Sequence, residues 1–478
     1  MRFELSWRVQ RDAYLWLPWA AVDRERLLRE LTVALPADED EPPKPPLQLY
    51  KLRSGYGGVG VPRNYATPLT WYGKELITKH GKRLRLPRGG TALGVRSKIR
   101  PRDQVQREAV EALCDGRRDK ILCLSCGKGK TVLSLHAAVQ CGLLPVLVVV
   151  PKRLLGQWVT RISEAWGIPR KKIGRAQQTE FRWKGLPIVV ASVHTLARRA
   201  EVYPEEFWSS FRVAIFDECH YLATPSLHVV CSLLSCERWG LTATLKRPDG
   251  MDWVLHLHLG KVCYENLEQP LKPVVYFVWT GVHYKGNWAG FRRQARLWTW
   301  MGANKGRNQL ISSVVEKCYS NGRQLLILGE RRKNLKHLHE VCTADSKGLI
   351  LHETKQREKI LKRQVVFATQ HLAKDGLDKQ TLDTLLVLCV FGSEGRFRQS
   401  CGRILRELYD GGTKKQPKVF IFVDNIEAIV KMAVKLEQYA QELGFKTKRI
   451  GKWDVKIDRG SGRAFRRVRR DRVYGRAA

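Results

Sequence analysis

Short runs of Val, Ile and Leu alternate with stretches of helical character from residue 99 onward. Such runs are typical of buried strands in a parallel sheet that helices cover on both faces. One series of runs precedes residue 245 and a second series follows residue 324. The runs are Lys120–Leu124, Val146–Val150, Ile188–Ala191, Val213–Phe216 and Gly240–Thr244, then Leu325–Leu328, Leu349–Leu351, Val365–Ala368, Leu385–Leu388 and Val419–Phe422. The pattern predicts an α/β fold with two sheets of similar construction.

The chain divides into four predicted regions. Residues 1–96 are rich in aromatic residues, so we expect a small N-terminal accessory α+β domain whose basic positions either face DNA or are simply solvated. Residues 97–270 and 271–450 hold the two sheets. Residues 451–478 form an Arg-rich basic tail, which either binds phosphate or is a solubilising end.

The net charge indicates a polyanionic partner. The 478 residues include 85 Lys and Arg against 46 Asp and Glu, a formal charge of +39. Basic side chains set against phosphates release counterions, so this excess favours nucleic acid over a merely basic surface. Because no apolar run reaches the roughly 18 residues that a membrane span needs, we expect a soluble, cytoplasmic protein without a membrane partner. The sequence indicates no particular protein partner.

A glycine-containing segment joins the first predicted strand to the apolar stretch Val132–Val139. This arrangement is typical of a phosphate loop, in which glycines let backbone N–H groups turn toward the phosphates of ATP. Lys130 can reach the β- and γ-phosphates, and the Thr131 hydroxyl can ligate Mg²⁺. The predicted nucleotide-binding residues here are Ser125, Cys126, Gly127, Lys128, Gly129, Lys130 and Thr131.

Two adjacent carboxylates, Asp217 and Glu218, follow the run Val213–Phe216. The carboxyl ends of parallel strands are where α/β sheets carry ligand chemistry. We expect Asp217 to hold Mg²⁺ through its waters and Glu218 to orient and deprotonate the water that attacks the γ-phosphate.

The phosphate loop, the box Asp217–His220 and the segment Gly240–Thr244 together resemble the motifs of superfamily 2 helicases and translocases. The extension Leu245–Gly250 resembles the XPB-like and phage UvsW-like branch. The resemblance implies two tandem RecA-like P-loop NTPase domains that bind ATP and Mg²⁺ between them and couple hydrolysis to unwinding or remodelling. The branch implies DNA, in single-stranded, forked or branched form, in replication, recombination or repair. The compactness of the chain, without long extensions, suggests a phage or bacterial, nucleoid-associated setting.

The same resemblance assigns roles to further residues of the first sheet. Gln106 is better spaced than Gln104 to read adenine. The residues that resemble strand-tracking motifs are Pro151, Lys152, Ser192 and Thr195, and those that resemble the coupling motif are Thr242 and Thr244.

In the second sheet, Gly376 and Asp378 resemble the motif that approaches nucleotide and strand together. Gln399, Arg403 and Arg406 form the pattern QxxGRxxR, and their spacing places them on one face of a helix. The resemblance implies that Arg403 and Arg406 act as arginine fingers on the developing γ-phosphate charge.

Three alternatives to a DNA helicase stay open: a non-unwinding motor of a restriction-type system, an RNA helicase, and an inactive nucleic-acid-binding scaffold. The aromatic and basic stretch Leu271–Leu310 is either a single-strand platform or sheet core. The nuclease-like set Asp345, Glu353 and Lys355 lies between helicase motifs, so nuclease activity is not favoured. We do not expect zinc, since the CxxC at Cys123 has no second pair at zinc-ribbon spacing.

Overall fold

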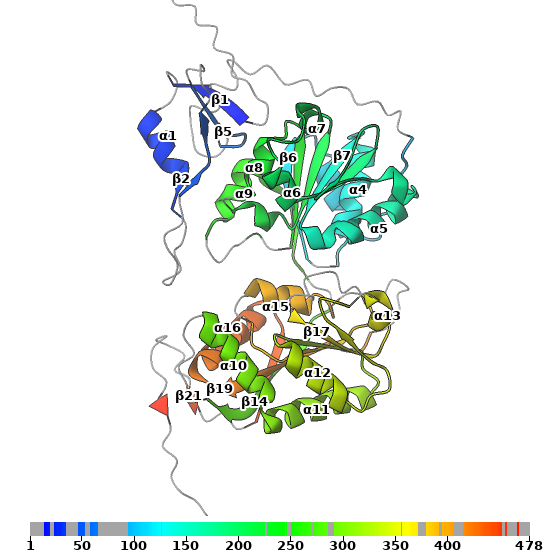
Figure 1. Cartoon of the computed structure of the whole chain (residues 1–478), viewed down its shortest axis with the longest axis vertical. Coiled ribbons are helices and arrows are strands. Elements are labelled where there is room, and N and C mark those ends of the chain that lie inside the picture. Colours follow the sequence, from blue (N-terminus) through cyan, green and yellow to red (C-terminus); the bar gives the residue numbers. More distant parts are fainter. Residues whose placement is uncertain are drawn as a thin grey trace, which may run out of the picture. The chain divides into compact units, whose positions relative to one another are not determined.

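The computed structural model describes residues 14–19, 23–34, 46–52, 58–65, 94–125, 127–224, 227–243, 245, 250–268, 271–284, 291–354, 356–370, 379–391, 394–405, 414–451, 455–456 and 466–467. The chain forms two compact units, Met1–Glu268 and Gln269–Ala478 (Figure 1). None of the described helices is both long and apolar enough to cross a bilayer.

The first unit is built on an eight-stranded sheet in the order β13-β6-β12-β11-β7-β10-β8-β9. All neighbours are parallel except β8 and β9. The strands are β6 (Asp119–Leu124), β7 (Val146–Val150), β8 (Gly174–Gln177), β9 (Glu180–Arg182), β10 (Ile188–Ser192), β11 (Val213–Asp217), β12 (Glu237–Thr242) and β13 (Lys261–Asn266).

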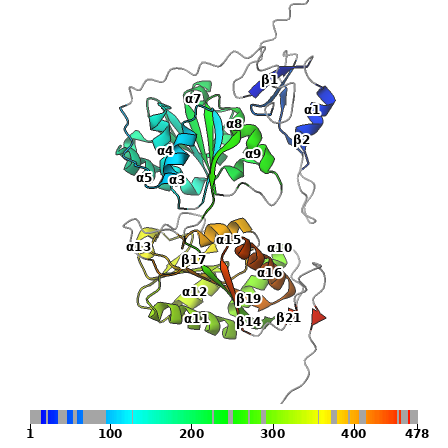
Figure 2. The same cartoon turned by 180° about the vertical axis from the view of Figure 1, so that it is seen from behind.

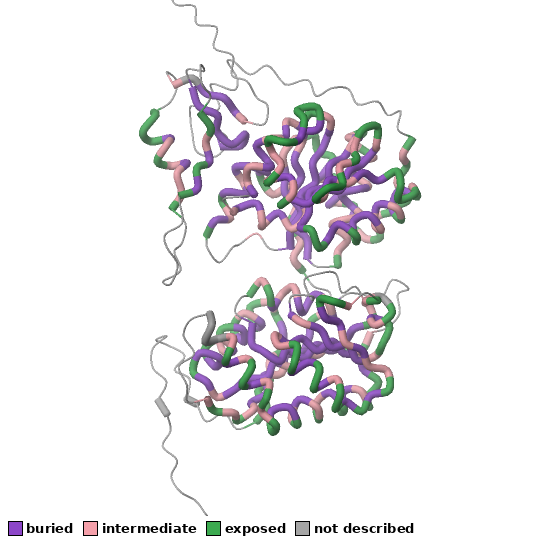
Figure 3. The backbone as a smooth tube through the Cα atoms, in the orientation of Figure 1, coloured by how far each residue is buried: buried purple, intermediate pink, exposed green. Residues whose placement is uncertain are grey.

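Side chains along these strands alternate between two cores, one on each face of the sheet. In β7, Val146, Val148 and Val150 pack with helices α3, α4 and α5, whereas Leu147 and Val149 belong to the opposite core. The first set of helices is α3 (Gln104–Leu113), α4 (Lys130–Gln140) and α5 (Leu155–Trp166), and the opposite core includes α6 (Val193–Arg198), α7 (Glu205–Ser209), α8 (Val229–Ser232) and α9 (Asp252–Leu259) (Figure 2). Burial on both faces explains the uninterrupted apolar runs, and these strands are the buried centre of the unit in Figure 3.

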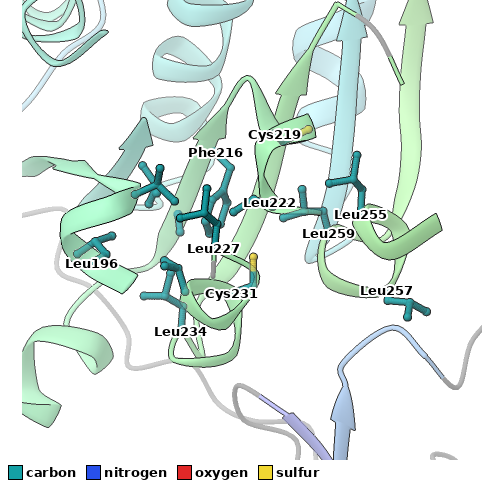
Figure 4. Close-up of a cluster of buried hydrophobic side chains, with 14 of the residues drawn as sticks. Leu196, Phe216, Cys219, Leu222, Leu227, Cys231, Leu234, Leu255, Leu257 and Leu259 are labelled. Carbon is teal, nitrogen blue, oxygen red and sulfur yellow. The ribbon is translucent and has the colours of Figure 1, made fainter. Parts of the chain in front are cut away.

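The core on the α8 and α9 face continues into the N-terminal elements. Phe216 of β11 belongs to this core, as do Leu222, Leu227 and Leu255 (Figure 4). Leucines and valines of β1 (Tyr14–Pro18), α1 (Arg24–Glu30), β3 (Leu47–Gln48) and β5 (Gly58–Pro62) belong to the same cluster. The boundary predicted at residue 96 stays a prediction, since residues 66–93 lie outside the described part of the chain.

A buried ion pair also ties the N-terminal elements to the sheet. Arg63, 1% exposed, follows β5 and donates from Nε to Asp119 Oδ2 at 2.8 Å. Asp119 is the first residue of β6 and also accepts from the Arg238 backbone N–H at 3.2 Å. Opposite charge from both arginines lowers the pKa of Asp119 against the effect of its burial. Strand β6, which leads to the phosphate loop, is therefore anchored at its opposite end by Arg63, a residue of the N-terminal elements.

The second unit has a seven-stranded, fully parallel sheet in the order β16-β17-β15-β18-β19-β14-β20. Its strands are β14 (Val274–His283), β15 (Leu325–Gly329), β16 (Lys347–Ile350), β17 (Val365–Thr369), β18 (Thr384–Val387), β19 (Lys418–Asn425) and β20 (Lys446–Ile450). One core includes residues of α10 (Phe291–Ala303), α15 (Glu394–Cys401) and α16 (Glu427–Glu442), and the other includes residues of α11 (Lys305–Ser320) and α12 (Arg332–Val341). The predicted α/β fold with two parallel sheets is confirmed.

The stretch Leu271–Leu310 contributes mainly to this second sheet and its helices. Phe277 and Trp279 lie on β14 in the core, and Trp298 of α10 packs against it, which the core alternative predicts. Trp300 is 38% exposed and contacts Tyr284, with ring centroids 4.9 Å apart. The single-strand platform is thus limited, among the described aromatic residues, to the Trp300 end of α10.

Candidate active site

Several of the predicted site residues that the structure describes in the first unit lie at one edge of its sheet. In the parallel register Asp217 pairs with Leu241, and Thr242 pairs with Cys123. Ser192 pairs with Val150, so β10 and β7 end at the same level. Since all these strands run in one direction, their carboxyl ends bring the phosphate loop and the two carboxylates to a common edge.

The phosphate loop turns through glycines that adopt left-handed backbone angles. Gly127 and Gly129 both have φ of +88°, a conformation that side chains with Cβ disfavour. Helix α4 begins directly afterward at Lys130, whose ammonium donates to the carbonyls of Leu124 at 2.7 Å and Ser125 at 3.3 Å. The lysine thus lies within the curve of the loop, at the helix N-terminus where anions are favoured.

Gln106 connects helix α3 to this loop. Its Nε2 donates to the Lys128 carbonyl at 3.2 Å, while its Oε1 accepts from the Arg102 N–H at 3.0 Å. A Cβ at Gly129 would come within 3.2 Å of the same Nε2. Gln104 instead bonds to Glu108, with which it shares an exposed helix face. The structure brings Gln106 to the phosphate loop and leaves Gln104 on the outer side of α3.

Asp217 is held by two hydrogen bonds at the end of β11. Trp158 Nε1 donates to its Oδ2 at 2.8 Å, and the backbone N–H of Glu218 donates to its Oδ1 at 3.0 Å. Burial and the neighbouring Glu218 charge raise the pKa of Asp217 to about 6, although Trp158 and Lys130 act in the opposite direction. The carboxylate is therefore oriented, and its ionised form, which burial and Glu218 destabilise, would be stabilised by a bound cation.

Glu218 adopts an unusual backbone conformation. Its φ is +51°, a left-handed value that is costly for a residue with a long side chain. Its Oε2 lies 3.4 Å from His220 Nδ1. Strain of this kind is concentrated at functional sites, where the surrounding structure holds one residue in place.

These residues fit a magnesium nucleotide. Mg²⁺ prefers hard oxygen ligands and keeps several waters, so an oriented carboxylate and a hydroxyl at a helix start suit it. Asp217 and Thr131, the second residue of α4, supply those two groups. No group of three or more His, Cys, Asp or Glu among the described residues could form an all-protein metal centre. Magnesium would supply charge neutralisation to bound phosphates here.

The strand-tracking candidates have unequal access to solvent. Lys152 is exposed at the start of a short 3-10 helix, whereas Pro151 before it is buried. Ser192 is only 1% exposed, and Thr195 Oγ1 accepts from the Gln178 N–H at 3.4 Å. Lys152 is thus the most accessible of the four. Thr242, which the sequence predicts to be a coupling residue, is fully buried at the end of β12.

In the second unit, α15 carries Gln399 and ends at Cys401. Arg403 lies in the following turn, where its backbone N–H donates to the Ser400 carbonyl at 3.2 Å. The prediction that Arg403 shares one helical face with Gln399 is wrong, because the helix stops before it. The remaining predicted site residues Cys126, Thr244, Gly376, Asp378 and Arg406 lie outside the described residues.

Sequence reasoning missed the role of Trp158 beside Asp217. The apolar spacing of Leu155, Trp158, Val159 and Ile162 along α5 marks Trp158 as a core residue, which it is at 1% exposure. A buried indole usually finds an acceptor for its N–H, and that rule is the signal available from the sequence. The identity of the acceptor depends on how α5 packs against β11.

Comparison with known proteins places these features in a family context. Residues 98–247 match the family described as "Type III restriction enzyme, res subunit". The chain is 24% identical over 344 residues to "Putative ATP-dependent RNA helicase L396" of Acanthamoeba polyphaga mimivirus. The aligned region covers 68% of this chain and 64% of that protein. The chain is also 30% identical over 179 residues to "DNA 3'-5' translocase XPB2" of Sulfurisphaera tokodaii, or 37% of this chain and 38% of that one. The chain thus spans less than two thirds of either relative.

Among solved structures, Mss116p bound to ssRNA and AMP-PNP has a similar fold. The match covers 73% of this chain and 74% of that chain, with a TM-score of 0.52 and 12% sequence identity. These comparisons confirm the resemblance to superfamily 2 helicases and translocases, and the two units have the RecA-like fold.

Proposed function

We propose that the chain is an ATP-dependent DNA helicase or translocase that couples ATP hydrolysis to unwinding or remodelling of DNA. The observation that carries the proposal is the oriented Asp217–Glu218 pair at the same sheet edge as the Lys130 loop. That arrangement supplies a phosphate cradle, a cation ligand and a base, which are the parts that phosphoryl transfer to water requires.

Each part of the site has a distinct role in the proposed reaction. Lys130 binds the β- and γ-phosphates, and Gln106 reads the adenine from the helix before the loop. Asp217 and Thr131 hold Mg²⁺, while Glu218 orients the attacking water and accepts its proton.

The second unit supplies charge and strand contacts in this proposal. Arg403 and Arg406 stabilise charge on the transferring phosphate, and Gln399 is a further catalytic residue of the same motif. Gly376 and Asp378 respond to nucleotide, as do Thr242 and Thr244 in the first unit. Lys152, with Pro151, Ser192 and Thr195 around it, contacts the strand backbone.

DNA is the proposed partner, and the charge of +39 fits a nucleic acid of either kind. The DNA translocase among the relatives and the segment Leu245–Gly250 favour DNA. RNA is the second candidate, because another relative has RNA helicase in its name. A restriction-type motor is a third, favoured by the description of the matched family.

Steady-state ATP hydrolysis tests the proposal. The rate is measured without nucleic acid and with single-stranded DNA, duplex, forked DNA and RNA, for the wild type and for Lys130→Ala. We expect stimulation by DNA, strongest with forks, and loss of activity in the variant. Selective stimulation by RNA would transfer the function to RNA, and no hydrolysis with any substrate would leave a binding scaffold. Stimulation by duplex without strand separation would favour a restriction-type motor.

A further inference from the structure

Two cysteine side chains meet at the far ends of the helices that flank the phosphate loop. Cys114 terminates α3 and Cys141 terminates α4, and these two helices lie side by side. The two sulfur atoms are 2.7 Å apart, with Cys141 Sγ donating to Cys114 Sγ. Both are free thiols. The sulfurs in a disulfide are about 2.05 Å apart, so a shift of about 0.65 Å would bring this pair to bonding distance.

The surroundings of Cys114 favour attack on an oxidant. Its side chain is exposed, whereas Cys141 is partly buried. The hydrogen bond from Cys141 and the charge of Lys120 lower the pKa of the Cys114 thiol against the effects of burial and Asp115. Cys263 lies near the same lysine, but its thiol pKa is shifted in the opposite direction, because burial raises it to about 11. Since the thiolate is the nucleophile, Cys114 is the reactive member of the pair.

We propose that Cys114 and Cys141 form a reversible disulfide and that the oxidant is a low-molecular-weight disulfide. The Cys114 thiolate attacks one sulfur of the oxidant, whose S–S bond breaks and releases one thiolate. Cys141 then loses its proton to solvent and attacks Cys114 Sγ in the mixed disulfide, which releases the second thiolate. Two protein thiols are oxidised, and the small disulfide is reduced to two thiols that take up the two protons.

The bond would close a ring around the nucleotide-binding segment. Cys114 and Cys141 are 27 residues apart in the chain. The ring encloses β6, the phosphate loop with Lys130, and α4. Cross-linking across such a ring restricts the unfolded chain and raises the unfolding temperature. A surface-accessible disulfide is also reversible by thiols, as is usual for disulfides formed in reducing compartments. None of these steps depends on the proposed function.

Peptide mapping of the full chain tests the proposal. The native protein is incubated with glutathione disulfide, the remaining thiols are alkylated, and the digest is analysed by mass spectrometry. We expect a linked Cys114–Cys141 peptide that disappears on reduction, and an unfolding temperature about 5 °C above that of the reduced protein. Cys141→Ser should instead retain glutathione on Cys114, since the resolving thiol is gone.

Cys263→Ser is the matched control, because Cys263 is a partly buried cysteine near the same lysine. It should form the link as the wild type does. Wild-type protein that keeps glutathione on Cys114, or in which both thiols are alkylated after oxidation, would overturn the proposal. A link that forms only in denaturant would also overturn it.

Discussion

The indole Nε1 of Trp158 donates a 2.8 Å hydrogen bond to Oδ2 of Asp217. Trp158 is a core residue of α5 at 1% exposure, so its ring has little freedom to turn away. This hydrogen bond fixes one carboxylate oxygen of Asp217 and leaves the remaining lone pairs of the carboxylate free to bind water or a cation. In the proposed site Asp217 is a magnesium ligand, and a group that orients such a ligand contributes to activity without touching the substrate.

Replacing Trp158 with Phe should lower the ATP turnover number more than it weakens ATP binding. Phe keeps an aromatic ring in the core and removes only the donor, so we expect a roughly tenfold loss of kcat and a higher Mg²⁺ requirement. Steady-state kinetics with a Mg²⁺ titration measure both. Trp166→Phe is the control, since Trp166 lies on the same helix and its indole N–H donates to the Leu135 carbonyl rather than to Asp217. Equal effects of the two substitutions would assign Trp158 a purely structural role.

Glu218→Gln and Lys130→Ala should separate turnover from binding. The glutamine keeps the size of Glu218 but cannot accept a proton, so ATP should still bind while hydrolysis falls by about 100-fold or more. Lys130→Ala should lose nucleotide affinity, because the charge within the loop is gone. Fluorescent ATP binding and single-turnover hydrolysis distinguish the two. Tight ATP binding by the Lys130 variant would contradict the assignment of the phosphate loop.

The sequence predicted most of the strands in the middle of both sheets and, in the run Leu349–Leu351, part of the edge strand β16, but it did not predict the edge strands β9, β13 and β20. Val146–Val150 and Leu325–Leu328 are apolar throughout because both faces are covered, and that leaves a clear pattern. The edge strand β20 is mostly exposed and reads KTKRI, so no apolar run marks it. The phosphate loop and the Asp217–Glu218 pair were recognisable in the sequence because each follows an apolar run, and the structure brings both to one edge of the sheet. The Trp158–Asp217 bond was not predictable, because it joins residues 59 apart through tertiary packing.

Replacing Arg63 should destabilise the first unit strongly. The side chains of Arg63 and Asp119 are 1% and 2% exposed, so Arg63→Met leaves a buried carboxylate without its ion-pair partner. We expect a loss of about 3 kcal/mol in the free energy of unfolding, measured by urea denaturation. Arg26→Met, which breaks the exposed ion pair with Glu30, should leave the midpoint almost unchanged. If the two variants were equally stable, Arg63 would not anchor the N-terminal elements.

Acid should destabilise the first unit through His228. Burial lowers the pKa of His228 to about 4, whereas an unfolded histidine titrates near 6.5. Between these values the unfolded state binds a proton that the folded state does not, so stability is complete above about pH 6.5 and falls toward pH 4. His258, whose ring centroid is 5.6 Å away, has its pKa lowered in the same direction.

Urea denaturation at a series of pH values should show the wild type losing roughly 2 kcal/mol more of its free energy of unfolding than His228→Gln over this range. The substitution His194→Gln on the exposed side of α6 should follow the wild-type profile. Identical pH profiles for wild type and His228→Gln would show that His228 does not couple folding to acid.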